Sequence, residues 1–212
     1  MPDANLERTI AACMTSFYGN TGQRCLANAN LVIVGEGLSD REYDAFYQKV
    51  VDAFVAAAKR IRMGYGLDDT IHMGPIRDEK KKANVLKYIE KGIAEGATLT
   101  LDGREFEIVG DLPDTCFIGP TVFEDVTVDM AIARDEIFGP VANMMKARSL
   151  QEGIDMIHQI PFGNAASIFT QNGKWAREFQ YNVECGNIGI NTGIAAPMAF
   201  FPFSGMKDSF FG

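Results

Sequence analysis

The chain has 212 residues, 47% of them hydrophobic, which is enough for one large domain with a substantial core. Its formal net charge of −8 disfavours a protein that neutralises the phosphates of nucleic acids. No stretch approaches the ~20 consecutive apolar residues of a membrane span, and the first residues lack a signal-peptide pattern. We therefore expect a cytoplasmic protein with no membrane or nucleic-acid partner.

The chain begins with a predicted helix that leads into a buried strand. Apolar residues recur at helical spacing over residues 6–17, with Asp3 as the expected N-cap. The sequence Gly-Asn-Thr-Gly at 19–22 ends this helix, and the apolar, β-branched residues of 27–34 predict a strand of a parallel sheet. Cys25 is thereby placed at a helix-to-strand junction.

Two longer helices are predicted next. Ser39 and Glu42 form a capping-box pattern ahead of an apolar helical face that extends to Ala58. A further helix is predicted over residues 78–95, with Ile93 among its inward-facing residues. Both helices are amphipathic, which is typical of helices that cover a sheet.

The remaining segments alternate between strands and helices. Four strands are predicted, at residues 98–101, 141–146, 165–170 and 187–191. One helix is opened by Ser149 and another lies near Trp175. This alternation predicts an α/β fold with a largely parallel twisted sheet flanked by helices, and no linker divides the single domain 1–212.

Metal and nucleotide motifs are missing from the sequence. Four cysteines and two histidines occur, widely separated: Cys13, Cys25, Cys116, Cys185, His72 and His158. They form neither a CxxC pair nor an HExxH motif, so no metal site is expected. Neither a GxGxxG fingerprint nor a GxxxxGK[ST] loop is present, so most of any dinucleotide site must be formed by residues outside this sequence.

The segment Gly19 to Cys25 is the most informative for chemistry. Glycines permit tight turns with free N–H groups that lower a thiol pKa and hold an oxyanion, so Cys25 is a candidate nucleophile. Taken alone, the same segment favours an ordinary buried cysteine over a nucleophile.

Five blocks in order resemble the aldehyde dehydrogenase family. They are Gly19–Cys25, Met73-Gly74-Pro75, Glu136–Pro140, Gly163–Thr170 and Pro202–Lys207. The resemblance covers the whole chain and corresponds to the C-terminal catalytic part of the family's enzymes. It implies that the N-terminal cofactor domain and the C-terminal oligomerisation tail are absent from these 212 residues, and that the fragment alone is inactive. The two ends of the chain look most like the methylmalonate-semialdehyde branch.

The resemblance also implies a mechanism. Cys25 would attack an aldehyde such as malonate or methylmalonate semialdehyde, NAD would take a hydride, and coenzyme A would accept the acyl group. Glu136 would hold the nicotinamide ribose and Phe138 would pack against the nicotinamide. Arg24 would pair with the substrate carboxylate and Phe203 would form an apolar wall of the aldehyde pocket.

Further expectations concern the surroundings of the site. The resemblance places residues 191–202 at the substrate entrance, and it implies a homo-oligomer, dimer or tetramer, for the complete enzyme. An exposed sheet edge, where the absent half would otherwise lie, favours self-association.

Two other interpretations remain open from the sequence. Cys25 paired with His72 or His158 would make a hydrolase or acyltransferase. The chain could also be a non-catalytic, truncated domain that only assembles with partners.

Overall fold

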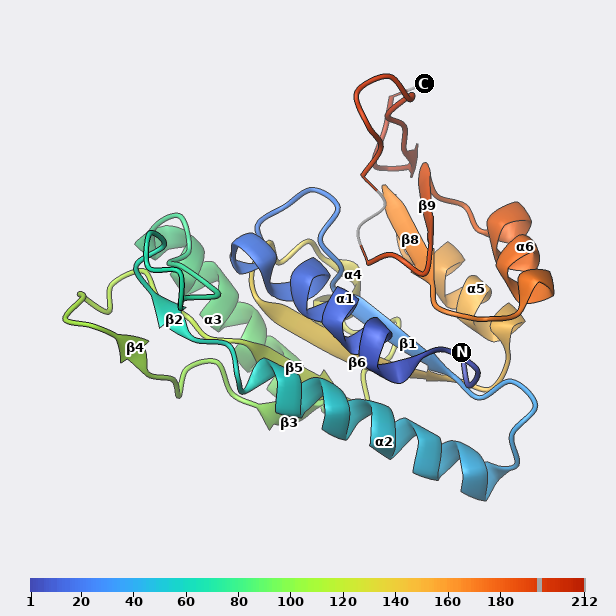
Figure 1. Ribbon diagram of the computed structural model, residues 1–212, viewed down its shortest axis with the longest axis horizontal. Coiled ribbons are helices and arrows are strands. Elements are labelled where there is room, and N and C mark those ends of the chain that lie inside the picture. Colours follow the sequence, from blue (N-terminus) through green and yellow to red (C-terminus); the bar gives the residue numbers. More distant parts are fainter. Residues whose placement is uncertain (194–195, 212) are drawn as a thin grey trace.

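The computed structural model describes residues 1–193 and 196–211, and its centre is a twisted four-stranded sheet with strand order β1-β6-β5-β3 (Figure 1). The strands are β1 (Asn30–Val34), β6 (Val141–Ala147), β5 (Thr121–Glu124) and β3 (Thr98–Leu101). β1, β6 and β5 run parallel, and β3 pairs antiparallel with β5. The predicted α/β fold with a largely parallel sheet is confirmed.

Helices cover both faces of this sheet. On one face lie α1 (Leu6–Tyr18) and α2 (Asp40–Ala58), and on the other lie α3 (Glu79–Ala94) and α4 (Ala131–Arg134). Successive side chains of a strand point to opposite faces. Accordingly, Ala142 and Met144 of β6 pack in the cluster with α1 and α2, while Val141 and Met145 pack in the cluster with α3 and α4.

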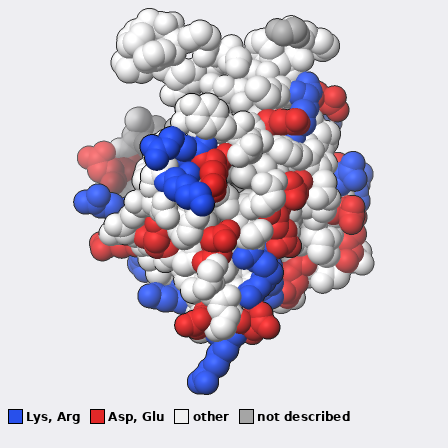
Figure 2. Space-filling model, turned by 90° about the vertical axis from the view of Figure 1, so that its right-hand side faces the viewer, with Lys and Arg blue, Asp and Glu red and all other residues white. Residues whose placement is uncertain are grey.

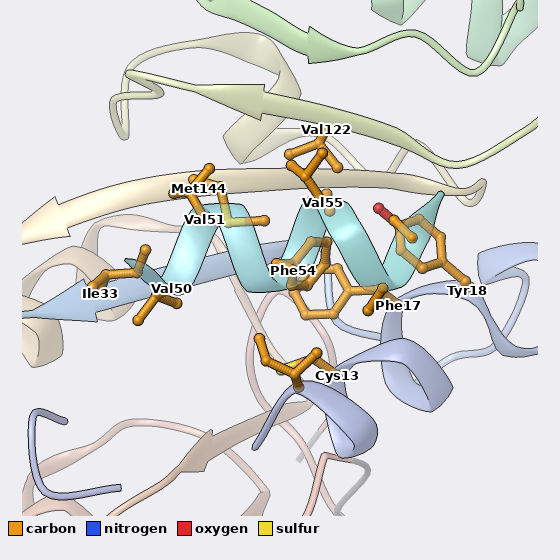
Figure 3. Close-up of a cluster of buried hydrophobic side chains, with 14 of the residues drawn as sticks. Cys13, Phe17, Tyr18, Ile33, Val50, Val51, Phe54, Val55, Val122 and Met144 are labelled. Carbon is orange, nitrogen blue, oxygen red and sulfur yellow. The ribbon is translucent and has the colours of Figure 1, made fainter. Parts of the chain in front are cut away.

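The larger core lies between α2, α1 and the sheet (Figure 3). Phe54 of α2 is fully buried, and its ring meets Phe17 of α1 edge-on with centroids 5.4 Å apart. Val51 and Val55 of the same helix point toward Met144 and the neighbouring strand (Figure 3). This packing fixes α1, whose C-terminal end leads directly into the loop before Cys25.

A second, smaller unit follows in the C-terminal part. β8 (Ala165–Ile168) pairs in parallel with β9 (Asn187–Ile190), and α5 (Leu150–Gln159) and α6 (Gly173–Asn182) pack with them around a third buried cluster. Ser149 caps α5 as predicted, because its hydroxyl accepts a hydrogen bond from the backbone N–H of Glu152. The predicted strands thus divide between two sheets, which the sequence pattern did not reveal.

The remaining elements are short. β2 (Met63–Gly64) pairs with β4 (Ile108–Val109), β7 (Phe162–Gly163) pairs with β10 (Met206–Lys207), and η1 (Gly19–Gly22) is a single turn after α1. Of the segment 191–202 that was expected at the substrate entrance, residues 194 and 195 lie outside the described part of the chain.

The N-terminal segment ties the two units together. The sequence predicted Asp3 as the N-cap of α1, and this prediction is wrong. Asn5 accepts the capping hydrogen bond from the N–H of Arg8. Instead the Asp3 carboxylate accepts hydrogen bonds from the hydroxyl of Thr170 at 2.9 Å and from the N–H of Gln171 at 2.7 Å, just beyond β8. Local spacing favoured Asp3 as a cap, but a long-range pair of donors engages it.

The other helix predictions are largely confirmed. The carboxylate of Glu42 accepts hydrogen bonds from the N–H and hydroxyl of Ser39 at the start of α2. The inward position of Ile93 is wrong, since 40% of this residue is exposed. Gly92 faces the core instead, because an added Cβ there would meet the side chains of Ile132 and Phe123.

Candidate active site

The loop before Cys25 has an uncommon backbone. Asn20, Thr21 and Gly22 have φ of 53°, 56° and 67°, so three consecutive residues are left-handed. The left-handed conformation costs an L-residue about 1–2 kcal/mol, and it is most costly for a β-branched residue such as Thr21. Such a turn persists only where surrounding contacts hold it in place.

Several hydrogen bonds hold this turn. Thr21 is buried, and its hydroxyl donates to the carbonyl of Gly74 at 3.0 Å. Asn20 donates from Nδ2 to the carbonyl of Gln23, and Oε1 of Gln23 accepts from the N–H of Arg77 at 3.0 Å. The Met73-Gly74-Pro75 block therefore supports residues 19–25, the loop that carries the candidate nucleophile Cys25 and is called the nucleophile loop below. This support gives the block a structural role.

Two glycines bring the Glu136–Pro140 block against the same loop. A Cβ added to Gly22 would lie 2.6 Å from the carbonyl carbon of Gly139 and closer still to its oxygen. The two backbones are thus in contact with no room for a side chain. This contact brings the segment that carries Glu136 and Phe138 beside the loop that carries Cys25.

A cavity of about 480 Å³ opens beside these loops. Cys25, Asn28, Asn30 and Glu136 line it, together with residues of β1 and β8. Within the described residues β1 pairs only with β6 and β8 only with β9, so each of these strands leaves one edge unpaired. The cavity therefore lies between the two sheets, with the candidate nucleophile at its wall.

Cys25 is the exposed cysteine of the four. Cys13 and Cys185 are buried, and burial raises the pKa of both thiols, that of Cys13 to about 12. Cys116 is half-buried and does not line the cavity. Cys13 also lines the cavity but is buried, so accessibility singles out Cys25, and the interpretation of Cys25 as an ordinary buried cysteine is wrong.

The other predicted site residues lie in different settings. Glu136 is exposed, and Phe138 is half-buried with a left-handed φ of 55°. Arg24 packs against Gly19 and donates from Nη2 to the carbonyl of Thr15, while its buried Nε has no hydrogen-bond partner. Phe203 is 49% exposed in the C-terminal segment and is not among the residues that line the cavity.

The two histidines are engaged elsewhere. Nδ1 of His72 accepts a hydrogen bond from the N–H of Arg62, and Nε2 of His158 lies 3.0 Å from the carbonyl of Asn182. Neither histidine is among the residues that line the cavity with Cys25. The arrangement does not favour a Cys–His hydrolase.

Three asparagines near the site were not predicted. Asn28 and Asn30 line the cavity, and Asn143 lies fully buried behind Asn30. The alternation of alanine and asparagine over residues 27–30, where a strand begins, was an available signal.

Within the described residues, no cluster of three or more potential ligands could hold a metal ion, and no helix is both long and apolar enough to cross a membrane.

Comparisons with known proteins agree with this arrangement. The chain is 45% identical over 210 residues to malonate-semialdehyde dehydrogenase of Bacillus subtilis strain 168, covering 99% of this chain and 40% of that protein. A malonate-semialdehyde dehydrogenase of Listeria monocytogenes is 44% identical with the same coverage. The chain thus spans about 40% of the length of these relatives.

A solved structure has the same fold. The methylmalonate-semialdehyde dehydrogenase of Oceanimonas doudoroffii superposes with a TM-score of 0.92 at 32% identity, covering 100% of this chain and 42% of that one. A protein of Sinorhizobium meliloti 1021, assigned as a methylmalonate-semialdehyde dehydrogenase and complexed with NAD, gives 0.92 at 35% identity, covering 100% and 41%. The model of the aldehyde dehydrogenase family matches residues 1–212, and the chain belongs to that family.

Proposed function

We propose that the complete enzyme oxidises malonate or methylmalonate semialdehyde to an acyl-CoA, with Cys25 as nucleophile and NAD as oxidant. The observation that carries this proposal is the exposed Cys25 thiol in a cavity that Glu136 also lines. The names of the relatives support the choice of substrate, and the NAD complex of the Sinorhizobium protein supports the choice of oxidant.

Cys25 carries the covalent chemistry. Its thiolate attacks the aldehyde carbon, so a carbon–sulfur bond forms and the negative charge moves to the aldehyde oxygen. When bound, NAD supplies the acceptor for the hydride that leaves this carbon. The resulting thioester on Cys25 is attacked by the thiol of coenzyme A, which releases the Cys25 thiolate and the acyl-CoA. With methylmalonate semialdehyde, the carboxylate leaves as carbon dioxide and the α-carbon takes up a proton from water, which gives a shorter acyl-CoA.

Glu136 and Phe138 fit a nicotinamide nucleoside. No hydrogen bond or ion pair within the described residues engages the Glu136 carboxylate. A free carboxylate can accept hydrogen bonds from both ribose hydroxyls and so fix the orientation of the ring. Phe138, held in its left-handed conformation beside Gly139, would pack against the nicotinamide.

Arg24 is proposed to bind the substrate carboxylate. Only its Nη2 is used, on the carbonyl of Thr15, and its Nε–H is buried without a partner. Its Nη1 makes no hydrogen bond within the described residues, and a guanidinium N–H next to the nucleophile in sequence favours an anion there. Phe203 is proposed to supply an apolar surface toward the aldehyde, for which its exposure in the C-terminal segment leaves it available.

The deciding experiment uses the full-length enzyme with malonate semialdehyde, NAD and coenzyme A. Cys25→Ser should abolish NADH formation, and mass spectrometry of the wild-type reaction should detect an acyl-CoA. Cys116→Ser, which changes a half-buried thiol away from the cavity, is the matched control and should keep activity. Retained activity in Cys25→Ser, or a free acid as the only product, would refute the proposal.

A second experiment tests whether Arg24 binds the substrate carboxylate or only supports the end of α1. Arg24→Ala should raise the KM for malonate semialdehyde at least tenfold more than the KM for a neutral aldehyde such as propanal. Equal losses for the two aldehydes would mean that the residue only supports the end of α1 through Thr15.

We also propose a cytoplasmic, self-associating enzyme. Its four free thiols suit a reducing compartment. Uncharged surface gathers at the top of the molecule, where the C-terminal segment protrudes (Figure 2). Phe200 and Phe201 of the C-terminal segment are 74% and 59% exposed, and exposed apolar patches commonly mark protein interfaces. Light scattering on the full-length enzyme should give a dimer or a tetramer, and a monomer would contradict this part.

A further inference from the structure

An amide pair lies buried between β1 and β6. Asn143 is completely buried in β6, where Val141, Ala142, Met144 and Met145 around it are also buried. Its Nδ2 donates to Oδ1 of Asn30 at 2.9 Å, and the two residues are register partners across the parallel strands. A polar side chain in the middle of an apolar strand needs a reason, because the core would accept an apolar residue there more readily.

Both amides also bind the same short turn. Nδ2 of Asn143 donates to the carbonyl of Ile132 at 2.8 Å, and Nδ2 of Asn30 donates to the carbonyl of Ala133 at 2.9 Å. These carbonyls belong to α4, a helix of four residues. A single turn is not stable by itself, and its last carbonyls lack partners within the helix. The two amides supply those partners.

The pair joins the two halves of the candidate site. Asn30 follows Cys25 by five residues and lines the same cavity, whereas α4 ends two residues before Glu136. Arg134 and Asp135, which lie between Ala133 and Glu136, are exposed, and Asp135 accepts a hydrogen bond from the hydroxyl of Tyr88 on α3. The amide pair is therefore a direct polar link between the strand after the nucleophile and the turn before Glu136.

The amide pair is not built for stability alone. Oδ1 of Asn143 is buried without a hydrogen-bond partner, which is an energetic cost that an apolar side chain would avoid. Both N–H groups of the Asn143 amide donate hydrogen bonds, whereas its oxygen accepts none. The donated hydrogen bonds are therefore the reason for an asparagine at this position. Its targets are Asn30 and the α4 carbonyl, which define the geometry of the turn.

We propose that the Asn30–Asn143 pair is a positioning device that holds Glu136 at a fixed place relative to Cys25. Neither asparagine touches the reacting atoms. The role of Glu136 toward NAD rests on the function proposed above, whereas the effect of the pair on the turn does not. Loss of the pair should loosen residues 131–138 and leave the nucleophile loop, which has its own hydrogen bonds to Gly74 and Arg77, unchanged.

The first test needs no cofactor. Hydrogen exchange is measured on the 212-residue chain and on Asn143→Leu, with Met145→Leu as control, since Met145 is buried on the same face of the same strand. Asn143→Leu should raise exchange in residues 131–138 at least tenfold and leave α2 unchanged. Unchanged exchange in 131–138, or an equal rise in every segment, would overturn the proposal.

The second test uses the full-length enzyme and a variant at a half-exposed position, Asn30→Ala, which should fold even if Asn143→Leu does not. NAD affinity should fall about tenfold, while the rate of Cys25 alkylation by iodoacetamide should stay within twofold. The double variant should lose no more than either single variant, because the two amides act as one unit. Parallel losses of NAD affinity and thiol reactivity, or additive losses, would indicate a general structural role instead. If wild-type enzyme does not bind NAD, the proposed function fails, and the exchange experiment still tests the pair.

Discussion

Replacing Gly22 by alanine should push the nucleophile loop away from the Glu136 segment. The new Cβ would lie 2.6 Å from the carbonyl carbon of Gly139, where ordinary contact needs ~3.5 Å, so the loops must separate by about 1 Å. Alanine at a φ of 67° costs roughly 1 kcal/mol, and relieving the overlap costs about 1–3 kcal/mol more. Urea denaturation should therefore show a loss of ~2–4 kcal/mol. A displacement of 1 Å between catalytic groups typically reduces the rate by about 10²-fold, which aldehyde oxidation by the full-length enzyme would measure.

The chain offers a matched control for this substitution. Gly37 has a φ of 75°, and no atom lies within 4 Å of an added Cβ. Gly37→Ala thus carries the backbone cost alone, about 1 kcal/mol, and should leave the rate unchanged. If Gly22→Ala is no more harmful than Gly37→Ala in stability and rate, the two loops do not depend on this contact and the reasoning fails.

Three further predictions concern a hydrogen bond, the thiols and an ion pair. Thr21→Val keeps the shape of the side chain but loses its donor, so urea denaturation should show a loss of about 1–2 kcal/mol, while Thr21→Ser should lose less than half as much. Iodoacetamide at neutral pH should modify Cys25 first and leave Cys13, whose pKa burial raises to about 12, unmodified, and peptide mass spectrometry would contradict this by finding equal labelling. The hydrogen bonds from Arg104 lower the pKa of Asp102, so this stabilisation is present at neutral pH and is lost as the pH falls through about 4 and below. Asp102→Asn should lower the free energy of unfolding by under ~1 kcal/mol at pH 7 and weaken the decrease of Tm below about pH 4. An unchanged decrease of Tm at acid pH would count against a stabilising Asp102–Arg104 pair.

Local signals in the sequence identified five of the six α-helices and five of the ten strands that the described residues form. The Ser39–Glu42 pattern correctly placed the start of α2, because capping is decided within one turn of the chain. β5 was not predicted, although Thr121 to Glu124 is almost entirely buried inside the sheet, because it directly follows Pro120, and proline weakens a strand pattern. Asp3 was misassigned because its true partners are distant in the sequence, at Thr170 and Gln171.

The candidate site divides in the same way. Cys25 as candidate nucleophile and Glu136 as candidate cofactor ligand could be proposed from motifs, since each motif is a short continuous segment. The left-handed turn depends on contacts with Gly74, and the Asn30–Asn143 pair depends on the register of β1 against β6. Register and long-range contacts arise only when the sheet is assembled, so no local pattern could reveal them.

The two units have separate buried clusters, and they meet through Asp3 and through α5, which packs against β1 and β6. This arrangement has a consequence for folding cooperativity. Units with separate cores unfold locally with different free energies, and the unit with the lower free energy of unfolding opens first. A substrate or coenzyme seated in the intervening cavity would touch both units and raise the free energy of opening for each. Binding and cooperative unfolding of this domain are therefore expected to be thermodynamically linked.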